Sequence, residues 1–81
     1  MYYVYMLQDL DKKIYLGYSS DLKRRITAHE SGTTHTTSRM KKPKLIYYES
    51  FSTEQLARER EGKLKQFGSS YTGLLKRLGL K

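Results

Sequence analysis

Residues 2–18 read YYVYMLQDLDKKIYLGY, which is two apolar and aromatic runs separated by a polar segment. The first run is Tyr2–Gln8 and the second is Lys13–Tyr18, and both are rich in residues that favour strands. The segment between them, Asp9-Leu10-Asp11-Lys12, has the polar composition of a turn. The chain is therefore predicted to begin with a β-hairpin.

A helix is predicted directly after the hairpin, over Asp21–Ser31. Ser19 or Ser20 can cap its first turn, and the carboxylate of Asp21 suits the positive end of the helix. Leu22 and Ile26 are spaced to face inward, and a glycine ends the helix.

The next segment, Ser31–Lys42, is rich in Thr, Ser and basic residues and has no regular period. We expect it to be a loop that ends at Pro43, where the third strand opens. That strand is predicted over Lys44–Phe51, because an apolar run lies at its centre.

Two further helices are predicted after the third strand. Ser52 and Gln55 form a capping box for the second helix, and Leu56, Leu64 and Phe67 mark its inner face. The second helix ends at a glycine.

The third helix is capped by Ser69 or Ser70 and carries the apolar stripe Leu74, Leu75 and Leu78. The predicted fold is an α/β (α+β) domain with a small three-stranded antiparallel sheet flanked by helices, in the order ββαβαα.

Length and composition limit the classes of protein. A chain of 81 residues encloses one modest core, so residues 1–81 are expected to form a single domain. It has no cysteine, which excludes disulfides and thiolate metal sites. No segment approaches the roughly 18 apolar residues of a membrane span. We expect a soluble, cytoplasmic protein with no membrane partner.

Charge indicates a polyanionic partner. Sixteen Lys and Arg against eight Asp and Glu give a net charge of +8, and two stretches, 31–48 and 62–81, contain no acid. Ribosomal, membrane-surface and simply well-solubilised domains share such clustering. The candidate nucleic-acid contacts are Lys23, Arg24, Arg39, Lys41, Lys42 and Lys63.

The spacing of a few polar and aromatic residues narrows the class of protein. Tyr3-Val4-Tyr5 is followed by Tyr15-Leu16-Gly17, and Arg25 comes ten residues after Tyr15. Over its whole length the chain resembles the catalytic domain of the GIY-YIG nuclease superfamily. It is most similar to the small single-domain bacterial members, which resemble the N-terminal domain of the excinuclease C protein.

The resemblance implies functional roles for five residues. It places the two motif tyrosines on Tyr5 and Tyr15, the arginine on Arg25 and a histidine on His29. The glutamate that binds the metal in the family is expected at Glu59. Two positions depart from the pattern: an aromatic, Tyr3, replaces the glycine that opens the first motif, and Tyr18 replaces a polar residue after the second.

These residue types suit phosphodiester hydrolysis. Glu59 would hold one Mg²⁺ or Mn²⁺, with waters and phosphate oxygens filling the remaining positions. Arg25 can fork onto two phosphate oxygens. Tyr15 is the candidate general base, although direct attack by its oxygen on phosphorus is an open alternative. Tyr5 would orient the attacking water, and His29 can accept a proton.

Each of these residues also has an ordinary structural interpretation. Tyrosines often serve as core and rim residues, and Arg25 could be a solvated helix charge. His29 could simply favour the negative end of its helix, and Glu59 could pair with Lys63 one turn away.

We therefore expect a divalent-metal-dependent endonuclease acting on DNA, directed by structure rather than sequence, in repair or processing. Structured or single-stranded DNA is the expected substrate, and RNA is an open possibility. The alternative is a nucleic-acid-binding module without useful catalysis.

Overall fold

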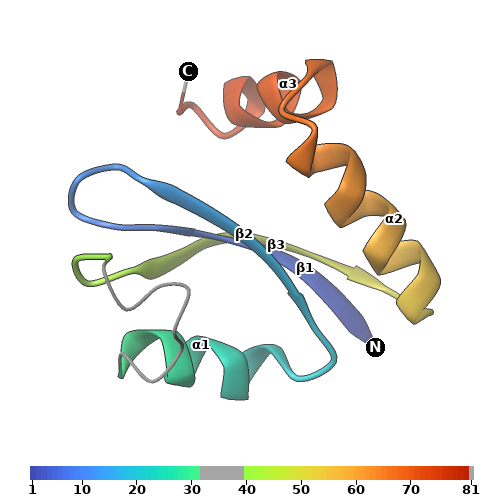
Figure 1. The fold of residues 1–81 in the computed structure, drawn as a ribbon, viewed down its shortest axis with the longest axis horizontal. Helices are drawn as coiled ribbons and strands as arrows, with labels where there is room; N and C mark the ends of the chain where they lie inside the picture. The colour runs from blue at the N-terminus through green and yellow to red at the C-terminus, as the bar shows by residue number, and fades with distance from the viewer. Residues whose placement is uncertain (32–39, 81) are drawn as a thin grey trace.

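A computed structural model describes residues 1–31 and 40–80 of the chain. A three-stranded antiparallel sheet forms its centre, in the order β2-β1-β3 (Figure 1). The strands are β1 (Tyr2–Gln8), β2 (Ile14–Ser19) and β3 (Lys44–Phe51). The predicted hairpin, third strand and order ββαβαα are confirmed.

Helices cover both faces of this sheet. The helix α1 (Leu22–Glu30) lies against one face, whereas α2 (Glu54–Lys65) and α3 (Ser69–Arg77) lie on the other (Figure 1). On the second face the sheet packs into the main core, whose buried members are Val4, Met6, Leu16, Ala57, Leu64, Leu74 and Leu75. The central strand is therefore buried from both sides, which explains why its sequence is almost continuously apolar.

Strand register determines which side chains face α1. Tyr5 lies opposite Gly17 on β2 and Tyr48 on β3. Side chains alternate along a strand, so Tyr5 points to the face opposite Val4 and Met6. A register shift between Met6 and Leu7 adds an extra residue on β3. Tyrosine, glycine and tyrosine thus share one row across the sheet.

The helix caps differ by one residue from the prediction. Asp21 itself caps α1, because its Oδ1 accepts a hydrogen bond of 3.1 Å from the backbone N of Arg24. Thr53 caps α2 through a bond of 3.2 Å from the backbone N of Leu56. The third helix begins after Gly68 with no side-chain cap. Neighbouring Ser, Thr and Asp residues are nearly equivalent caps, so their composition alone does not fix the choice.

The inner face of α2 was predicted wrongly at two of its three positions. Leu64 is buried as expected, but Leu56 is 46% exposed and Phe67 is 63% exposed. Ala57 is fully buried instead. The helix is therefore rotated by about one residue, or roughly 100°, from the orientation that Leu56 indicated.

A buried carboxylate fastens the hairpin turn to the approach of β3. Asp9 Oδ1 accepts hydrogen bonds from the backbone N atoms of Asp11 and Lys13, at 2.9 and 2.8 Å. Its Oδ2 accepts one of 3.3 Å from the backbone N of Lys41. This contact fixes where the chain re-enters the sheet. Most of the predicted loop before it lies outside the described residues.

Candidate active site

Three aromatic side chains meet on the face of the sheet that α1 covers. The hydroxyl of Tyr5 and Nε2 of His29 share a hydrogen bond of 2.8 Å. The ring of Tyr15 lies 5.2 Å from that of His29 and 6.2 Å from that of Tyr5, measured between centroids. Two strands and a helix therefore bring together three of the predicted site residues.

Gly17 makes room for this cluster. A Cβ atom at this position would lie 2.5 Å from the hydroxyl oxygen of Tyr5 and 2.9 Å from Cε2 of Tyr15. Both distances are shorter than a side chain tolerates, and Gly17 lies opposite Tyr5 in the sheet. The glycine of the second motif is thus required by the close passage of the Tyr5 ring across β2.

Burial and nearby groups shift the pKa values of Tyr5 and His29. Burial, and then the neighbouring Tyr15, raises the pKa of Tyr5 well above the ordinary 10.0. Burial, and then the positive charge of Arg25, lowers the pKa of His29 below the ordinary 6.5. At neutral pH the Tyr5 phenol therefore keeps its proton and the imidazole is uncharged. Tyr15 is only half-buried, so it is the tyrosine of the pair that can meet a ligand.

Arg25 supplies positive charge next to the cluster. It projects from α1 and is exposed, and its charge acts on both Tyr5 and His29. It also lines a hollow of about 370 Å³ with Arg24 and Ser20. The guanidinium can therefore reach a ligand that approaches the aromatic cluster from solvent.

The structure does not bring Glu59 into this group. Glu59 is exposed, accepts a hydrogen bond of 3.2 Å from Gln55, and lines a surface hollow with Arg58. Residues two apart on a helix point in nearly opposite directions. Glu61 accordingly lies on the other side of α2, where its negative charge raises the pKa of Tyr5.

Glu61 is thus a candidate that the sequence interpretation missed. Its side chain is 21% exposed and pairs with Lys65, with Oε2 3.4 Å from Nζ. Ala57, four residues before Glu61, is the residue from which the orientation of Glu61 could have been predicted. A helix turned so that Ala57 and Leu64 face the core also turns Glu61 toward the sheet.

The donor set around Glu61 suits a hard cation held mainly by water and substrate. In the described part of the chain, no three His, Asp or Glu residues gather as metal ligands. Mg²⁺ commonly binds through one or two carboxylates and keeps several waters. One partly exposed carboxylate, whose charge acts on Tyr5, fits that mode and does not fit a closed structural metal site.

The predicted nucleic-acid contacts occupy several surfaces. Lys23 and Arg24 are exposed on α1, and Lys63 is exposed on α2. Lys41 Nζ lies 3.6 Å from Asp11 Oδ2, in a surface ion pair. The neighbouring Lys42 has a positive φ of 50°. Arg39 lies outside the described residues.

A polar network on the opposite face fastens α2 and α3 to β3. Arg60 donates to both oxygens of Glu49, at 2.8 and 3.0 Å. Tyr47 donates to Glu49 at 2.7 Å, and Arg77 donates to the Tyr47 hydroxyl at 2.9 Å. Arg60 can therefore lie on the packed side of α2 because Glu49 pairs with its charge, and the network joins the helices to the sheet.

Comparison with known proteins identifies the family. Residues 1–74 match the family model of the GIY-YIG catalytic domain. The chain therefore belongs to the GIY-YIG family, whose domain has a nuclease-type fold.

The structure offers no candidate membrane span within residues 1–31 and 40–80, because none of the helices there has the length and apolar character to cross a bilayer.

Bacterial relatives place the chain among small members of the family. It is 37% identical over 65 residues to the UPF0213 protein SpyM3_1077 of Streptococcus pyogenes serotype M3, covering 79% of this chain and 71% of the relative. The solution NMR structure of the UPF0213 protein BH0048 from Bacillus halodurans matches with a TM-score of 0.59 and 30% identity. That match covers 96% of this chain and 85% of the other.

Proposed function

We propose that this chain is a divalent-metal-dependent endonuclease that hydrolyses phosphodiester bonds in DNA, acting in repair or processing. The observation that carries this proposal is the convergence of Tyr5, Tyr15 and His29, with the charges of Arg25 and Glu61 both acting on Tyr5. A positive and a negative group near ionisable hydroxyls suit a reaction at phosphorus, because charge must be neutralised and a proton moved.

Arg25 binds and neutralises the scissile phosphate in this proposal. Its planar guanidinium can donate two parallel hydrogen bonds to phosphate oxygens, which lysine cannot reproduce. Because it is exposed beside the aromatic cluster, it needs little rearrangement to reach them. Its contribution grows as negative charge develops on the phosphate oxygens in the transition state.

The tyrosines divide the work on the attacking water. Tyr15 is the accessible phenol and accepts the proton of the water, which requires Tyr15 to react as phenolate. Tyr5 is buried and hydrogen-bonded to His29, so it keeps its own proton. Its fixed ring holds the ring of Tyr15 in place. The rival mechanism is attack by the oxygen of Tyr15 on phosphorus, which would leave a tyrosyl phosphodiester bonded to the protein.

Glu61, rather than Glu59, would hold one Mg²⁺ or Mn²⁺. When bound, such an ion supplies charge neutralisation at the phosphate and stabilises the leaving oxygen. The carboxylate of Glu61 suits it because its charge already acts on Tyr5 and its side chain remains partly exposed.

Binding is proposed to follow the shape of the DNA backbone. The candidate phosphate contacts remain Lys23, Arg24, Arg39, Lys41, Lys42 and Lys63. Lysine and arginine contacts to phosphate fix the position of a strand without reading its bases. Recognition by structure rather than sequence follows from that composition.

Cleavage by purified protein tests the proposal. Wild type should cut flap, splayed or single-stranded DNA when Mg²⁺ or Mn²⁺ is added, and should not cut in EDTA. Arg25→Ala should slow cleavage by about 1,000-fold, and Tyr15→Phe by about 100-fold or more. Structured RNAs in the same panel test for RNA cleavage.

The same panel separates the alternatives. A protein–DNA adduct that persists in denaturing gel and forms only with Tyr15 present would support direct tyrosine attack. Binding without cleavage of any substrate by wild type would instead show a non-catalytic binding module. Cleavage at the wild-type rate by both variants would contradict the proposed site.

A further inference from the structure

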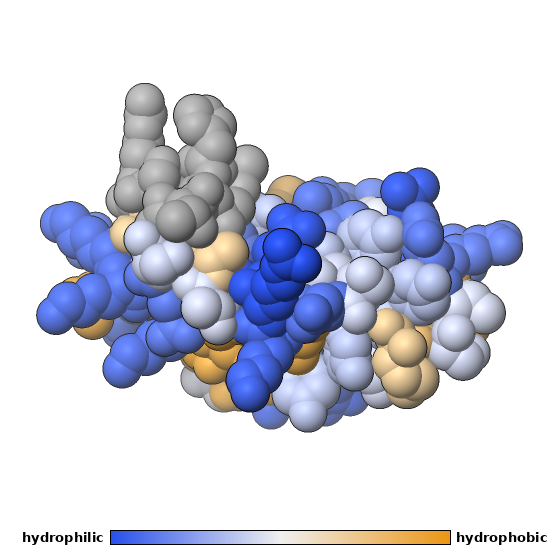
Figure 2. Space-filling view, turned by 90° about the horizontal axis from the view of Figure 1, so that it is seen from below, coloured by the Kyte–Doolittle hydropathy of each residue, from blue (hydrophilic) through white to orange (hydrophobic). Residues whose placement is uncertain are grey.

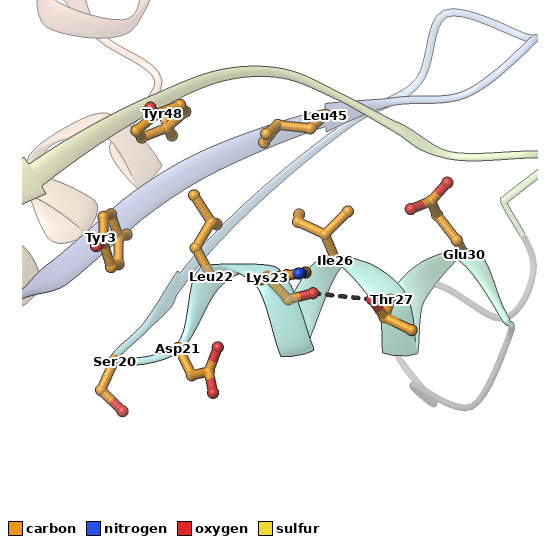
Figure 3. A pocket seen from close by; sticks show the side chains of 10 residues that line it. All are labelled: Tyr3, Ser20, Asp21, Leu22, Lys23, Ile26, Thr27, Glu30, Leu45 and Tyr48. Atoms are coloured by element: carbon orange, nitrogen blue, oxygen red, sulfur yellow. Dashed lines mark hydrogen bonds between the residues drawn. The ribbon is translucent and has the colours of Figure 1, made fainter.

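A second hollow lies on the other side of α1, between this helix and β3 (Figure 3). Its volume is about 590 Å³, within the range of small-molecule sites, which is roughly 300–1,000 Å³. Strands β1 and β3 supply one wall and α1 supplies the other. We call it the α1–β3 groove. Its principal lining residues are Tyr3, Lys23, Ile26, Glu30, Leu45 and Tyr48.

Aromatic and aliphatic side chains form the inside of the groove. Tyr3 and Tyr48 meet edge to face, with ring centroids 6.1 Å apart and ring planes at 65°. Tyr48 is nevertheless 53% exposed, so much of its ring has no protein cover. Leu22, Ile26 and Leu45 complete an apolar surface opposite and beside the rings. A flat aromatic ligand could stack on the ring of Tyr48 and contact the aliphatic side chains.

Charged groups surround this apolar surface. Seen from the side of α1, hydrophobic residues lie among strongly hydrophilic ones (Figure 2). Lys23 lines the groove and makes no ion pair with any carboxylate in the described part of the chain. Glu30 lies at the other end and can accept hydrogen bonds from amino groups. An occupant with an anionic end, a flat ring and polar edges fits this distribution.

The groove adjoins the hollow that lies beside the candidate active site. Tyr48 lies opposite Tyr5 in the strand register, so both belong to the face that α1 covers. Asp21, at the start of α1, lines both this groove and the hollow next to Arg25. A nucleic-acid strand that passes the first turn of α1 would therefore contact both hollows.

We propose that the α1–β3 groove receives one unpaired nucleobase of the bound DNA strand. The base stacks on Tyr48, Lys23 holds its phosphate, and Glu30 accepts a hydrogen bond from its edge. This inference rests on the proposed function, because it assumes that a DNA strand lies at Arg25. A second copy of the chain is a poorer occupant, since each copy carries a net charge of +8.

The groove would select DNA by structure. A base within a duplex is stacked on both faces and paired along its edge, so it cannot enter unless it is flipped out. A base in a flap or single strand enters without that cost. Stacking on an aromatic side chain tolerates every base, so this preference for unpaired DNA carries little sequence specificity.

Base deletion at single positions tests the groove directly. The binding of a duplex with a short flap is measured by fluorescence anisotropy in EDTA, so that no cleavage occurs. An abasic nucleotide is then placed at each flap position in turn. At one position, loss of the base should weaken binding to wild type by about 5- to 100-fold. The same abasic nucleotide should have no further effect on Tyr48→Ala.

Tyr48→Phe is the matched control, because it keeps the ring and removes only the hydroxyl. It should retain the abasic effect, and thermal unfolding followed by circular dichroism should show that both variants fold. Equal binding of every abasic flap to wild type, while metal-dependent cleavage persists, would overturn the groove and leave the proposed function intact. Absence of any DNA binding would overturn both. A concentration-dependent dimer that Tyr48→Ala abolishes would show that a second copy occupies the groove, which also overturns the proposal.

Discussion

Gly17 shows how a residue without a side chain determines a chemical site. The ring of Tyr5 crosses β2 where any Cβ atom would meet its hydroxyl at 2.5 Å. Gly17→Ala must therefore displace Tyr5 from His29. We expect the overpacked core to lose about 1–3 kcal/mol of unfolding free energy. Cleavage should fall by at least about tenfold, because Tyr15 loses its support.

Urea unfolding and single-turnover cleavage measure these two effects. Gly73→Ala is the control, because a Cβ atom there meets nothing within 4 Å. It lies inside α3, so alanine should raise the stability by about 0.5–1 kcal/mol and leave cleavage unchanged. Full activity in Gly17→Ala would contradict a positioning role for Tyr5.

Single residues were predictable where a motif fixes them and less so where helix rotation decides. Tyr5, Tyr15, Arg25 and His29 were expected in one site from their spacing, and the structure brings them together. The family pattern over residues 54–59 placed the metal-binding role on Glu59, whereas in the structure it is Glu61 whose charge acts on Tyr5. The rotation of α2 that favours Glu61 depends on the burial of Ala57 rather than Leu56, which the spacing of the leucines did not indicate.

At the scale of elements, strands were easier to predict than helix ends. The three strands carry concentrated aromatic and aliphatic runs. Such a run predicts a strand whichever face of the sheet it packs against. Caps depend on which of several adjacent polar residues adopts the required backbone angles, which composition does not specify. The hydrogen bonds between Glu49 and Arg60 join residues that are 11 positions apart in the sequence, so no local sequence pattern predicts them.

That network gives α2 a pH-dependent attachment to the sheet. Partial burial would raise the pKa of Glu49, but the hydrogen bonds from Arg60 and Tyr47 outweigh burial and lower it below the ordinary 4.5. The stabilisation is therefore complete above pH 4.5 and is lost as the pH falls through the lower value of the folded state. Glu49→Gln should cost about 1–3 kcal/mol at neutral pH and flatten this acid dependence.

Urea unfolding between neutral pH and pH 3 measures the effect. Glu54→Gln is the control, because its pair with Arg58 is largely exposed, at 46% and 66%. We expect it to change stability by less than about 1 kcal/mol. An unchanged acid dependence in Glu49→Gln would show that this carboxylate does not hold α2.

At the scale of the whole molecule, helices cover both faces of a small central sheet. The order β2-β1-β3 and the two helical layers follow from an apolar central strand, which must be covered on both sides. Sequence reasoning predicted the three-stranded antiparallel sheet flanked by helices, because hairpin, helix and third strand are local signals, but it did not predict the order of the strands in the sheet. It could not predict the α1–β3 groove, which forms where side chains from three elements leave space.

A net charge of +8 makes DNA binding sensitive to salt. Plots of the logarithm of the dissociation constant against that of the salt concentration give the number of phosphate contacts. If Lys41 and Lys42 bind phosphates, changing both to Gln should lower the slope by roughly 2. Arg77→Gln is the control, because this guanidinium is held by Tyr47 on the opposite face. An equal change from Arg77→Gln would show that the slope reflects total charge rather than phosphate contacts made by Lys41 and Lys42.

The most direct test compares two glutamates on the same helix. Cleavage of one flap substrate is measured at increasing Mg²⁺ or Mn²⁺ concentrations for Glu61→Gln and Glu59→Gln. The proposed site predicts a loss of roughly 100-fold or more for Glu61→Gln, with near wild-type rates and metal dependence for Glu59→Gln. Loss of activity in Glu59→Gln with an active Glu61→Gln would contradict the proposed site.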